Sequence, residues 1–235
     1  VGSAIHIASE RIVDKGKRIA AHRLEVSADD IEFDDGSFTV AGTDRSITLA
    51  EVAHIAFNPN AMPKGEDSGL SAFATFKHDL PTFPNGSHVA EVEIDPETGV
   101  VTVERYSVVD DVGTVMNPLL LKGQIHGGVV QGIGQILMER MVWDADSGQL
   151  VTGSMMDYCL PRADDVPFFQ VGSNPVPTPR NPLGVKGAGE AGTVGAMPCL
   201  MSAILDALGP LGVKDIEMPA SPERVWRAIQ AATGG

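Results

Sequence analysis

Glycine is concentrated in two short stretches of this 235-residue chain, and this clustering constrains the fold more than any other feature. The chain contains 26 glycines, and they gather around residues 123–134 and 184–195. Glycine has no Cβ atom, so such density indicates special backbone angles or a close approach of the main chain to another group. Both stretches are therefore candidates for tight packing or for ligand binding.

Charge and hydropathy restrict the class of protein. The chain has 17 basic and 31 acidic residues, a net charge of −14, which argues against binding to nucleic acid. A hydrophobic content of 43% predicts a folded interior in one large or two small domains. We find no run of about 18 apolar residues, so we expect no membrane span. The chain begins with Val1 and has no secretory leader, which predicts a cytoplasmic protein and a piece of something longer.

Metal-binding patterns are missing from the sequence. Cys159 and Cys199 are the only cysteines, and the six histidines are scattered without an HxH or HExxH pair. We therefore expect no metal held by protein ligands, and any metal would have to bring non-protein ligands with it. The two thiols are typical of a reducing cytosol.

Periodicity and turn signals predict an α+β fold, with hairpins and a mixed sheet packed with helices. Helices are predicted over about the first two dozen residues, from about residue 48, and over 118–139, 193–208 and 222–231. Hairpins are predicted over 31–40, 88–109 and 141–158, a loop over 58–72 and an extended connector over 172–182.

The predicted helix over 118–139 has a glycine face and a core face. On a helical wheel, one face carries Gln124, Gly127, Gly128, Gln131 and Gln135, and the core face carries Ile125, Val129, Ile133, Ile136 and Leu137. Each glycine costs a helix interior up to about 1 kcal/mol, so several need a compensating reason. That reason is either a polar ligand bound beside Gln124 or the close packing of another helix or strand.

The segment 184–195 contains GxGxxG from Gly187 to Gly192. A dinucleotide-binding site of this pattern needs a strand before it, but the prolines between residues 175 and 182 disfavour one. Only 43 residues follow Gly192, too few for several further βα units. The other interpretation is a helix N-terminus that cradles a ligand, with Glu190 as a base. Glu190 could instead simply cap the helix.

Three motifs occur in order along the chain and together carry a family resemblance. They are Asp110-Asp111-Val112-Gly113 leading to Asn117-Pro118, Gly123-Gln124-Ile125-His126-Gly127-Gly128 leading to Gln131-Gly132-Ile133-Gly134, and Lys186-Gly187-Ala188-Gly189-Glu190. Over essentially all of residues 1–235, the chain resembles the C-terminal part of the molybdenum-binding large subunit of the xanthine dehydrogenase, aldehyde oxidase and carbon monoxide dehydrogenase family. A boundary between two parts of this region is predicted near residues 58–86.

The resemblance implies part of a molybdenum hydroxylase, which oxidises a carbon centre of aldehyde or N-heterocycle type with water as the oxygen source. Its cofactor would be molybdopterin with molybdenum, in the cytosine dinucleotide form, and the complete enzyme would be an oligomer with FAD and [2Fe-2S] centres on partner subunits or domains. Glu190 matches the catalytic glutamate, and we expect it to be buried. The implied cofactor-binding residues are Gln124, Gly187, Ala188, Gly189, Lys186 and Asn117.

The chain lacks the family's earlier GGxFGxK-like motif and the residues upstream that shape the substrate pocket. We therefore expect the chain alone to bind the cofactor weakly and to be inactive. Two alternatives stay open here: a nucleotide-binding domain that uses Gly187–Gly192, and a non-catalytic interaction domain. Convergence of Gln124 and Glu190 in space would count against the second alternative.

Overall fold

The structure, a computed structural model, describes residues 1–234 and divides into two compact units. Unit 1 comprises residues 1–79 together with 181–183, and unit 2 comprises residues 80–180 and the chain from 184 onward. The division at residue 79 falls within the range 58–86 that the loop-rich sequence suggested. Each unit has its own hydrophobic core.

Unit 1 packs a long helix and a short helix against a small antiparallel sheet. Its elements are α1 (Gly2–Leu24), the 3₁₀ turn η1 (Ala28–Asp30), β1 (Ile31–Asp34), β2 (Ser37–Val40), β3 (Ser46–Thr48) and α2 (Leu49–Ala56). A Cβ atom on Gly16 would overlap the buried ring of Phe38, which explains a glycine in the middle of α1. A capping box between Thr48 and Glu51 starts α2, and the helix predicted from about residue 48 is confirmed.

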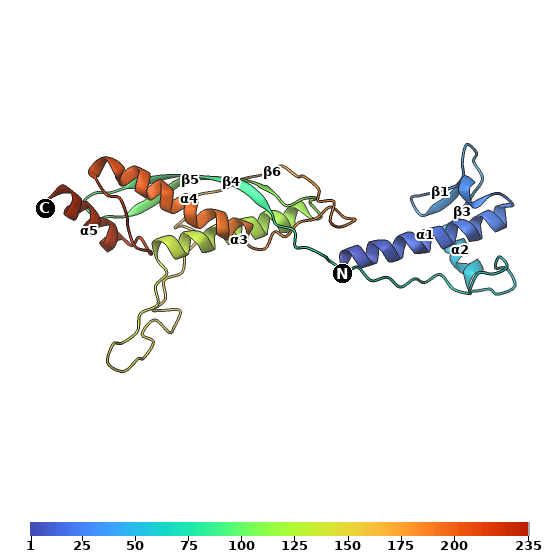
Figure 1. Cartoon of the computed structure of the whole chain (residues 1–235), viewed down its shortest axis with the longest axis horizontal. Coiled ribbons are helices and arrows are strands. Elements are labelled where there is room, and N and C mark those ends of the chain that lie inside the picture. The colour runs from blue at the N-terminus through green and yellow to red at the C-terminus, as the bar shows by residue number, and fades with distance from the viewer. Residues whose placement is uncertain (235) are drawn as a thin grey trace. The chain divides into compact units, whose positions relative to one another are not determined.

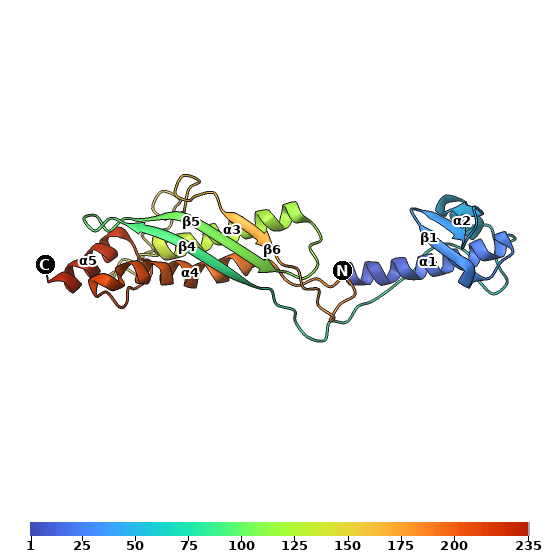
Figure 2. The same cartoon turned by 90° about the horizontal axis from the view of Figure 1, so that it is seen from above.

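Unit 2 is built on a mixed sheet of three strands. Strands β4 (Asn85–Ile94) and β5 (Val101–Asp111) form an antiparallel hairpin, in which His88 lies opposite Val108. Strand β6 (Gln170–Ser173) pairs in parallel with the end of β5. Figure 2 shows these three strands side by side.

Helices cover one face of the sheet of unit 2 (Figure 1). They are α3 (Pro118–Leu137) and α4 (Ala191–Leu208), and the chain closes with the 3₁₀ turn η2 (Gly209–Leu211) and α5 (Pro222–Thr233). The core between the layers contains Tyr106, Ile125, Val129, Leu200 and Ile204, each at most 1% exposed. The core face predicted for α3 is therefore confirmed, and so is the α+β class.

The glycines of α3 differ in what surrounds them. A Cβ atom on Gly132 would lie 2.6 Å from the Cβ of Ala196, and one on Gly128 would lie 3.0 Å from the backbone nitrogen of Thr193. These glycines let α4 pack closely against α3. By contrast, a Cβ on Gly123 or Gly127 would have no neighbour within 4 Å. Close packing therefore explains only some of the glycines of α3.

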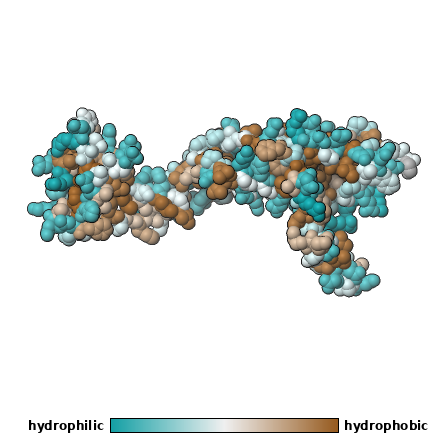
Figure 3. All heavy atoms as spheres, turned by 180° about the vertical axis from the view of Figure 1, so that it is seen from behind, coloured by the Kyte–Doolittle hydropathy of each residue, from teal (hydrophilic) through white to brown (hydrophobic). Residues whose placement is uncertain are grey.

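The hairpin predicted over 141–158 keeps its turn, where the backbone N–H of Asp144 donates to the carbonyl oxygen of Gln149, but its predicted strands are wrong. Its strands are reduced to one isolated bridge between Trp143 and Leu150. The segment projects away from α3 (Figure 1), and Figure 3 shows apolar atoms on the projecting part. Met155 and Met156 are 76% and 93% exposed, so the alternating pattern has no surface to pack against within unit 2. The sequence analysis also missed β6. Only an extended connector was predicted there, from residue 172 onward, and β6 overlaps its start.

The sequence contains no unbroken run of about 18 apolar residues, but a criterion of helix length and mean hydropathy is more permissive. The segment Ala191–Leu211 meets that criterion by length and composition, because a mean over a window tolerates Asp206 and the small residues that interrupt the apolar run. In the structure, Ala196, Leu200 and Ile204 on this helix are buried in the core of unit 2. The criterion by itself does not place α4 in a membrane.

Candidate functional site

A pocket of about 510 Å³ lies in unit 2, where the second glycine stretch meets the start of β4. One wall is residues 82–88, the other is the loop and first turn of α4 from Gly187 to Gly195, and Asp110 of β5 completes the lining. The volume is that of a small-molecule site. Glu190, the predicted catalytic residue, lines this pocket.

Gln124 joins the two glycine stretches. Its amide nitrogen donates a hydrogen bond of 2.8 Å to the carbonyl oxygen of Gly189, so α3 is tied to the residue immediately before Glu190. Glu190 is the N-cap residue of α4, and its side chain makes no capping hydrogen bond. It is exposed in this structure, so the described residues do not provide the burial expected for a base. The observed convergence favours a ligand site over a purely structural loop.

The backbone around Glu190 is open to a ligand. A Cβ atom on Gly189 would have no neighbour within 4 Å, and one on Gly187 would meet only the carbonyl oxygen of Thr82, at 3.7 Å. Both glycines line the pocket, whereas Ala188 between them does not. No packing contact accounts for these two glycines, and they leave room for a bulky group beside the main chain.

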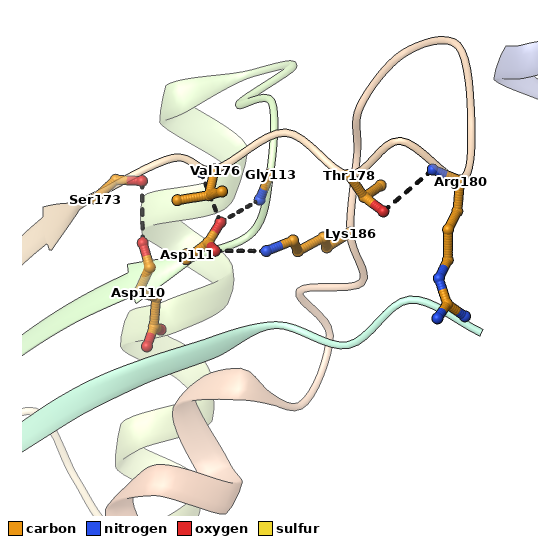
Figure 4. A network of polar contacts seen from close by, with 8 residues as sticks. All are labelled: Asp110, Asp111, Gly113, Ser173, Val176, Thr178, Arg180 and Lys186. Atoms are coloured by element: carbon orange, nitrogen blue, oxygen red, sulfur yellow. Dashed lines mark hydrogen bonds and ion pairs between the residues drawn. The ribbon is translucent and has the colours of Figure 1, made fainter. Parts of the chain in front are cut away.

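Lys186 anchors the loop that precedes Glu190. Its ammonium forms an ion pair with the carboxylate of Asp111 at the end of β5, where both side chains are nearly buried (Figure 4). Asp111 also accepts hydrogen bonds from the backbone N–H groups of Gly113, at 2.8 Å, and Val176, at 3.0 Å. The Lys186 ammonium, helped by these N–H groups, lowers the pKa of Asp111 from 3.8 to about 2. In this structure, then, Lys186 bonds to protein, and its contact with a cofactor stays a prediction.

Asn117 has a structural task that the sequence analysis did not assign. It is the N-cap residue of α3, and its side-chain oxygen accepts a 3.0 Å hydrogen bond from the backbone N–H of Leu120. It does not line the pocket that contains Glu190. Its predicted contact with a cofactor is therefore untested.

The sequence analysis missed His88 and gave Asp110 no role in the site. His88 in β4 and Asp110 in β5 line the pocket together, with 3.3 Å between Nε2 and Oδ1. The hairpin register was the available signal. It pairs His88 with Val108, so His88 and Asp110 are diagonal neighbours across the two strands.

Within residues 1–234, no group of three or more His, Cys, Asp or Glu side chains is arranged to hold a metal ion. The open backbone at Gly187 and Gly189, the amide of Gln124 and the carboxylate of Glu190 fit a bulky cofactor that carries its own metal ligands. These residues would contact the organic part of such a cofactor and would not ligate its metal.

Comparison with known proteins assigns the family. A family model described as the molybdopterin cofactor-binding domain matches residues 1–167. Relatives include the carbon monoxide dehydrogenase large chain of Hydrogenophaga pseudoflava, 36% identical over 230 residues, and the nicotine 6-hydroxylase large subunit of Paenarthrobacter nicotinovorans, 39% identical over 231 residues. Each match covers 97% of this chain and 28% of the relative. The chain belongs to the molybdopterin cofactor-binding domain family, and it corresponds to part of the large subunits of molybdopterin-dependent oxidoreductases.

Solved structures agree with this assignment. Reconstituted CO dehydrogenase from Oligotropha carboxidovorans superposes with a TM-score of 0.92 at 33% identity, over 100% of this chain and 29% of that chain. Quinoline 2-oxidoreductase from Pseudomonas putida 86 superposes with a TM-score of 0.87 at 38% identity, over 94% and 28% of the two chains. The chain therefore spans less than a third of these proteins.

The structure also bears on the nucleotide-binding alternative. Strand β6 ends at Ser173, and the residues between it and the GxGxxG sequence form only an isolated bridge from Val185 to Gly113. Among the described residues after Gly192 there are helices and turns but no strand. The parallel βαβ unit that positions a dinucleotide is thus missing from this part of the chain.

Proposed function

We propose that this chain forms a part of a molybdenum hydroxylase that contacts its cofactor and supplies its base. The reaction is the oxidation of a carbon centre, of aldehyde or N-heterocycle type, with water as the oxygen source. Two relatives support the N-heterocycle part of this range, since one is named for nicotine 6-hydroxylation and a structural neighbour for quinoline oxidation. The hydrogen bond from Gln124 to Gly189 carries the proposal, because it joins the two glycine stretches beside Glu190.

The cofactor we propose is molybdopterin with molybdenum, in the cytosine dinucleotide form, and it would supply the redox chemistry at the substrate carbon. The amide of Gln124 and the main chain at Gly187–Gly189 would hold it, and Lys186 and Asn117 are weaker candidates. The ion pair of Lys186 with Asp111 fixes the loop to β5, so the backbone is placed before a ligand binds.

Glu190 would accept and return a proton at its carboxylate. It stands at the first turn of α4, on the pocket wall, and no capping hydrogen bond engages it. This leaves its oxygens available to a bound molecule. Burial in the complete enzyme would then have to come from residues outside this chain.

We also propose partner subunits or domains that carry FAD and [2Fe-2S] centres and remove the electrons, an oligomeric complete enzyme, and a cytoplasmic location. Without the rest of the large subunit we expect the chain to be inactive and to retain the cofactor weakly. A molybdenum and pterin assay of the purified chain tests this, and stoichiometric molybdenum would contradict it.

Replacement of Glu190 by Gln in the assembled enzyme tests the proposed function. The substitution keeps the shape of the side chain but removes the base, so turnover should be lost while molybdenum and pterin content stay unchanged. Glu93→Gln, at an exposed position on β4, is the matched control and should turn over normally. Retained turnover in Glu190→Gln would reject the role.

A further inference from the structure

A chain of buried polar groups leads from α4 to the pocket. The hydroxyl of Tyr106 lies 2.6 Å from Nδ1 of His88, and Nε2 of His88 lies 3.3 Å from Oδ1 of Asp110. The side chains of His88 and Asp110 are only 6% and 3% exposed. Tyr106 also contacts the thiol of Cys199, and burial raises the pKa values of both groups, so both stay protonated.

This chain of contacts ends at an unsatisfied atom. Oδ2 of Asp110 has no hydrogen-bond partner among the described residues, although it is buried. An unsatisfied buried acceptor costs about 1–3 kcal/mol, more if it is charged. Such an atom in a native structure calls for an explanation, and a bound molecule that donates a hydrogen bond to it is one.

Two glycines make room for this arrangement. A Cβ atom on Gly195 would overlap the imidazole of His88, and one on Gly86 would overlap Oδ1 of Asp110. Both glycines line the same pocket as the two side chains. The histidine and the aspartate are thus fitted into the pocket wall and are not incidental surface residues.

The charge of the pocket indicates what it can bind. Its acidic lining residues are Asp110 and Glu190, and neither lysine nor arginine lines it. Phe83, Pro84 and Val194 supply apolar surface. The loop cations beside the pocket are engaged by the protein, because Lys186 is paired with Asp111 and Arg180 donates a hydrogen bond to the carbonyl oxygen of Pro81. This lining disfavours an anionic group and favours a flat or apolar group that bears hydrogen-bond donors.

We propose that Asp110, oriented by His88, is an acceptor subsite for a nitrogen-bound hydrogen of the molecule in the pocket. The recognised group is an amino or ring N–H on a heteroaromatic molecule, or a protonated amine. This N–H group belongs either to the cofactor or to the substrate, and the second arm of the test separates these two sources. This proposal rests on the proposed function, because Glu190 lines the same pocket. Binding at Asp110 can nevertheless be measured without any turnover.

The first arm of the test measures binding to the chain itself. The probes are 2-aminopyridine and 2-methylpyridine, which have similar shapes but differ in the N–H donor, at a pH where both are neutral. We expect NMR titration to give roughly tenfold tighter binding of the amine, with shifts in the His88 ring signals. Equal affinities in the unsubstituted chain would overturn the proposal, whatever the variants do.

The Asp110→Asn variant keeps the shape of the side chain but can present an amide donor to the pocket. We expect the tenfold preference for 2-aminopyridine to disappear in it, and to persist in Asp146→Asn, an exposed control position. A preference that survives Asp110→Asn would also overturn the proposal.

The second arm separates the two sources, using Asp110→Asn in the assembled enzyme. A cofactor donor predicts a loss of molybdenum and pterin content. A substrate donor predicts unchanged content and a roughly tenfold higher KM for substrates with an N–H group, at unchanged kcat. Unchanged content together with unchanged KM would reject the subsite. Failure of the proposed function would appear separately, as turnover retained by Glu190→Gln.

Discussion

Two sets of glycines in unit 2 differ in what surrounds them. Gly128, Gly132 and Gly192 lie where α3 and α4 touch, and a Cβ on Gly192 would come within 2.6 Å of the carbonyl oxygen of Ile125. Gly127 and Gly189 have nothing within 4 Å of the position of a Cβ. The first set makes the helix contact possible, whereas no packing contact accounts for the second.

This difference separates stability from binding within one sequence pattern. A glycine that packs should resist substitution because the fold needs it. An open glycine such as Gly189, next to Glu190, needs a different explanation, and we propose that a ligand lies against the main chain there. Substitutions at the two sets should therefore affect different measurements.

Gly192→Ala should have the largest effect. The added methyl group would press on the backbone of α3 at Ile125 and Val129, which cannot move aside as a side chain can. We expect a loss of about 3 kcal/mol in the free energy of unfolding. Urea denaturation followed by the fluorescence of Trp143 and Trp226, both in unit 2, measures it. A loss below about 1 kcal/mol would refute the packing role.

Lys186→Met should have the next largest effect, and a pH-dependent one. The pKa of Asp111 is depressed to about 2, so the ion pair stabilises the fold above its ordinary value of 3.8 and is lost as the pH falls toward 2. We expect the variant to be less stable by about 2 kcal/mol at pH 7.

The difference between the variant and the unsubstituted chain should shrink below about pH 4 and vanish only below the depressed pKa of Asp111, about 2. Urea midpoints across this range test the prediction. A difference that is constant with pH would mean that packing of the lysine stem, and not its charge, supports the loop.

Gly127→Ala and Gly128→Ala form a matched pair of neighbours in α3. Alanine at residue 127 meets no atom and should stabilise the helix by about 0.5–1 kcal/mol. At residue 128 it meets the backbone of Thr193 at 3.0 Å and should cost about 1 kcal/mol net. Equal effects, measured by the same unfolding assay, would erase the distinction between the two sets.

Gly189→Ala should have the smallest effect on stability, within about 0.5 kcal/mol, because its Cβ would enter open space. In the assembled enzyme we nevertheless expect it to lower the molybdenum and pterin content, since the methyl group would occupy the ligand's side of the loop. Normal cofactor content with normal stability would leave this glycine without the role we assign.

Local signals predicted most of the fold. The turn at residues 95–99 was predictable because Asp95 accepts hydrogen bonds from its own neighbours and Gly99 adopts a positive φ of 73°. Strand β6 gave no such signal, since it has four residues and its partner β5 lies more than 50 residues earlier. The segment 141–158 gave a false signal, because alternation produces a strand only where a surface exists to cover it.

Local sequence signals also predicted part of the candidate site. Gln124 and Glu190 each belong to a continuous sequence motif, so sequence analysis could propose that the two residues meet. His88 appeared only as one residue in an alternating strand, and its importance depends on Asp110, 22 residues further on. An orphaned atom such as Oδ2 of Asp110 can be identified only once all its neighbours are placed.

The connectivity of unit 2 also affects how the protein is made. The β4–β5 hairpin closes through a short turn, but the pocket wall needs α4, which follows some 80 residues after β5. Contacts this distant in sequence form late, because a long loop must close first. During translation, α3 and the hairpin therefore leave the ribosome with their apolar faces uncovered, and we expect this interval to be the time when chaperones matter most.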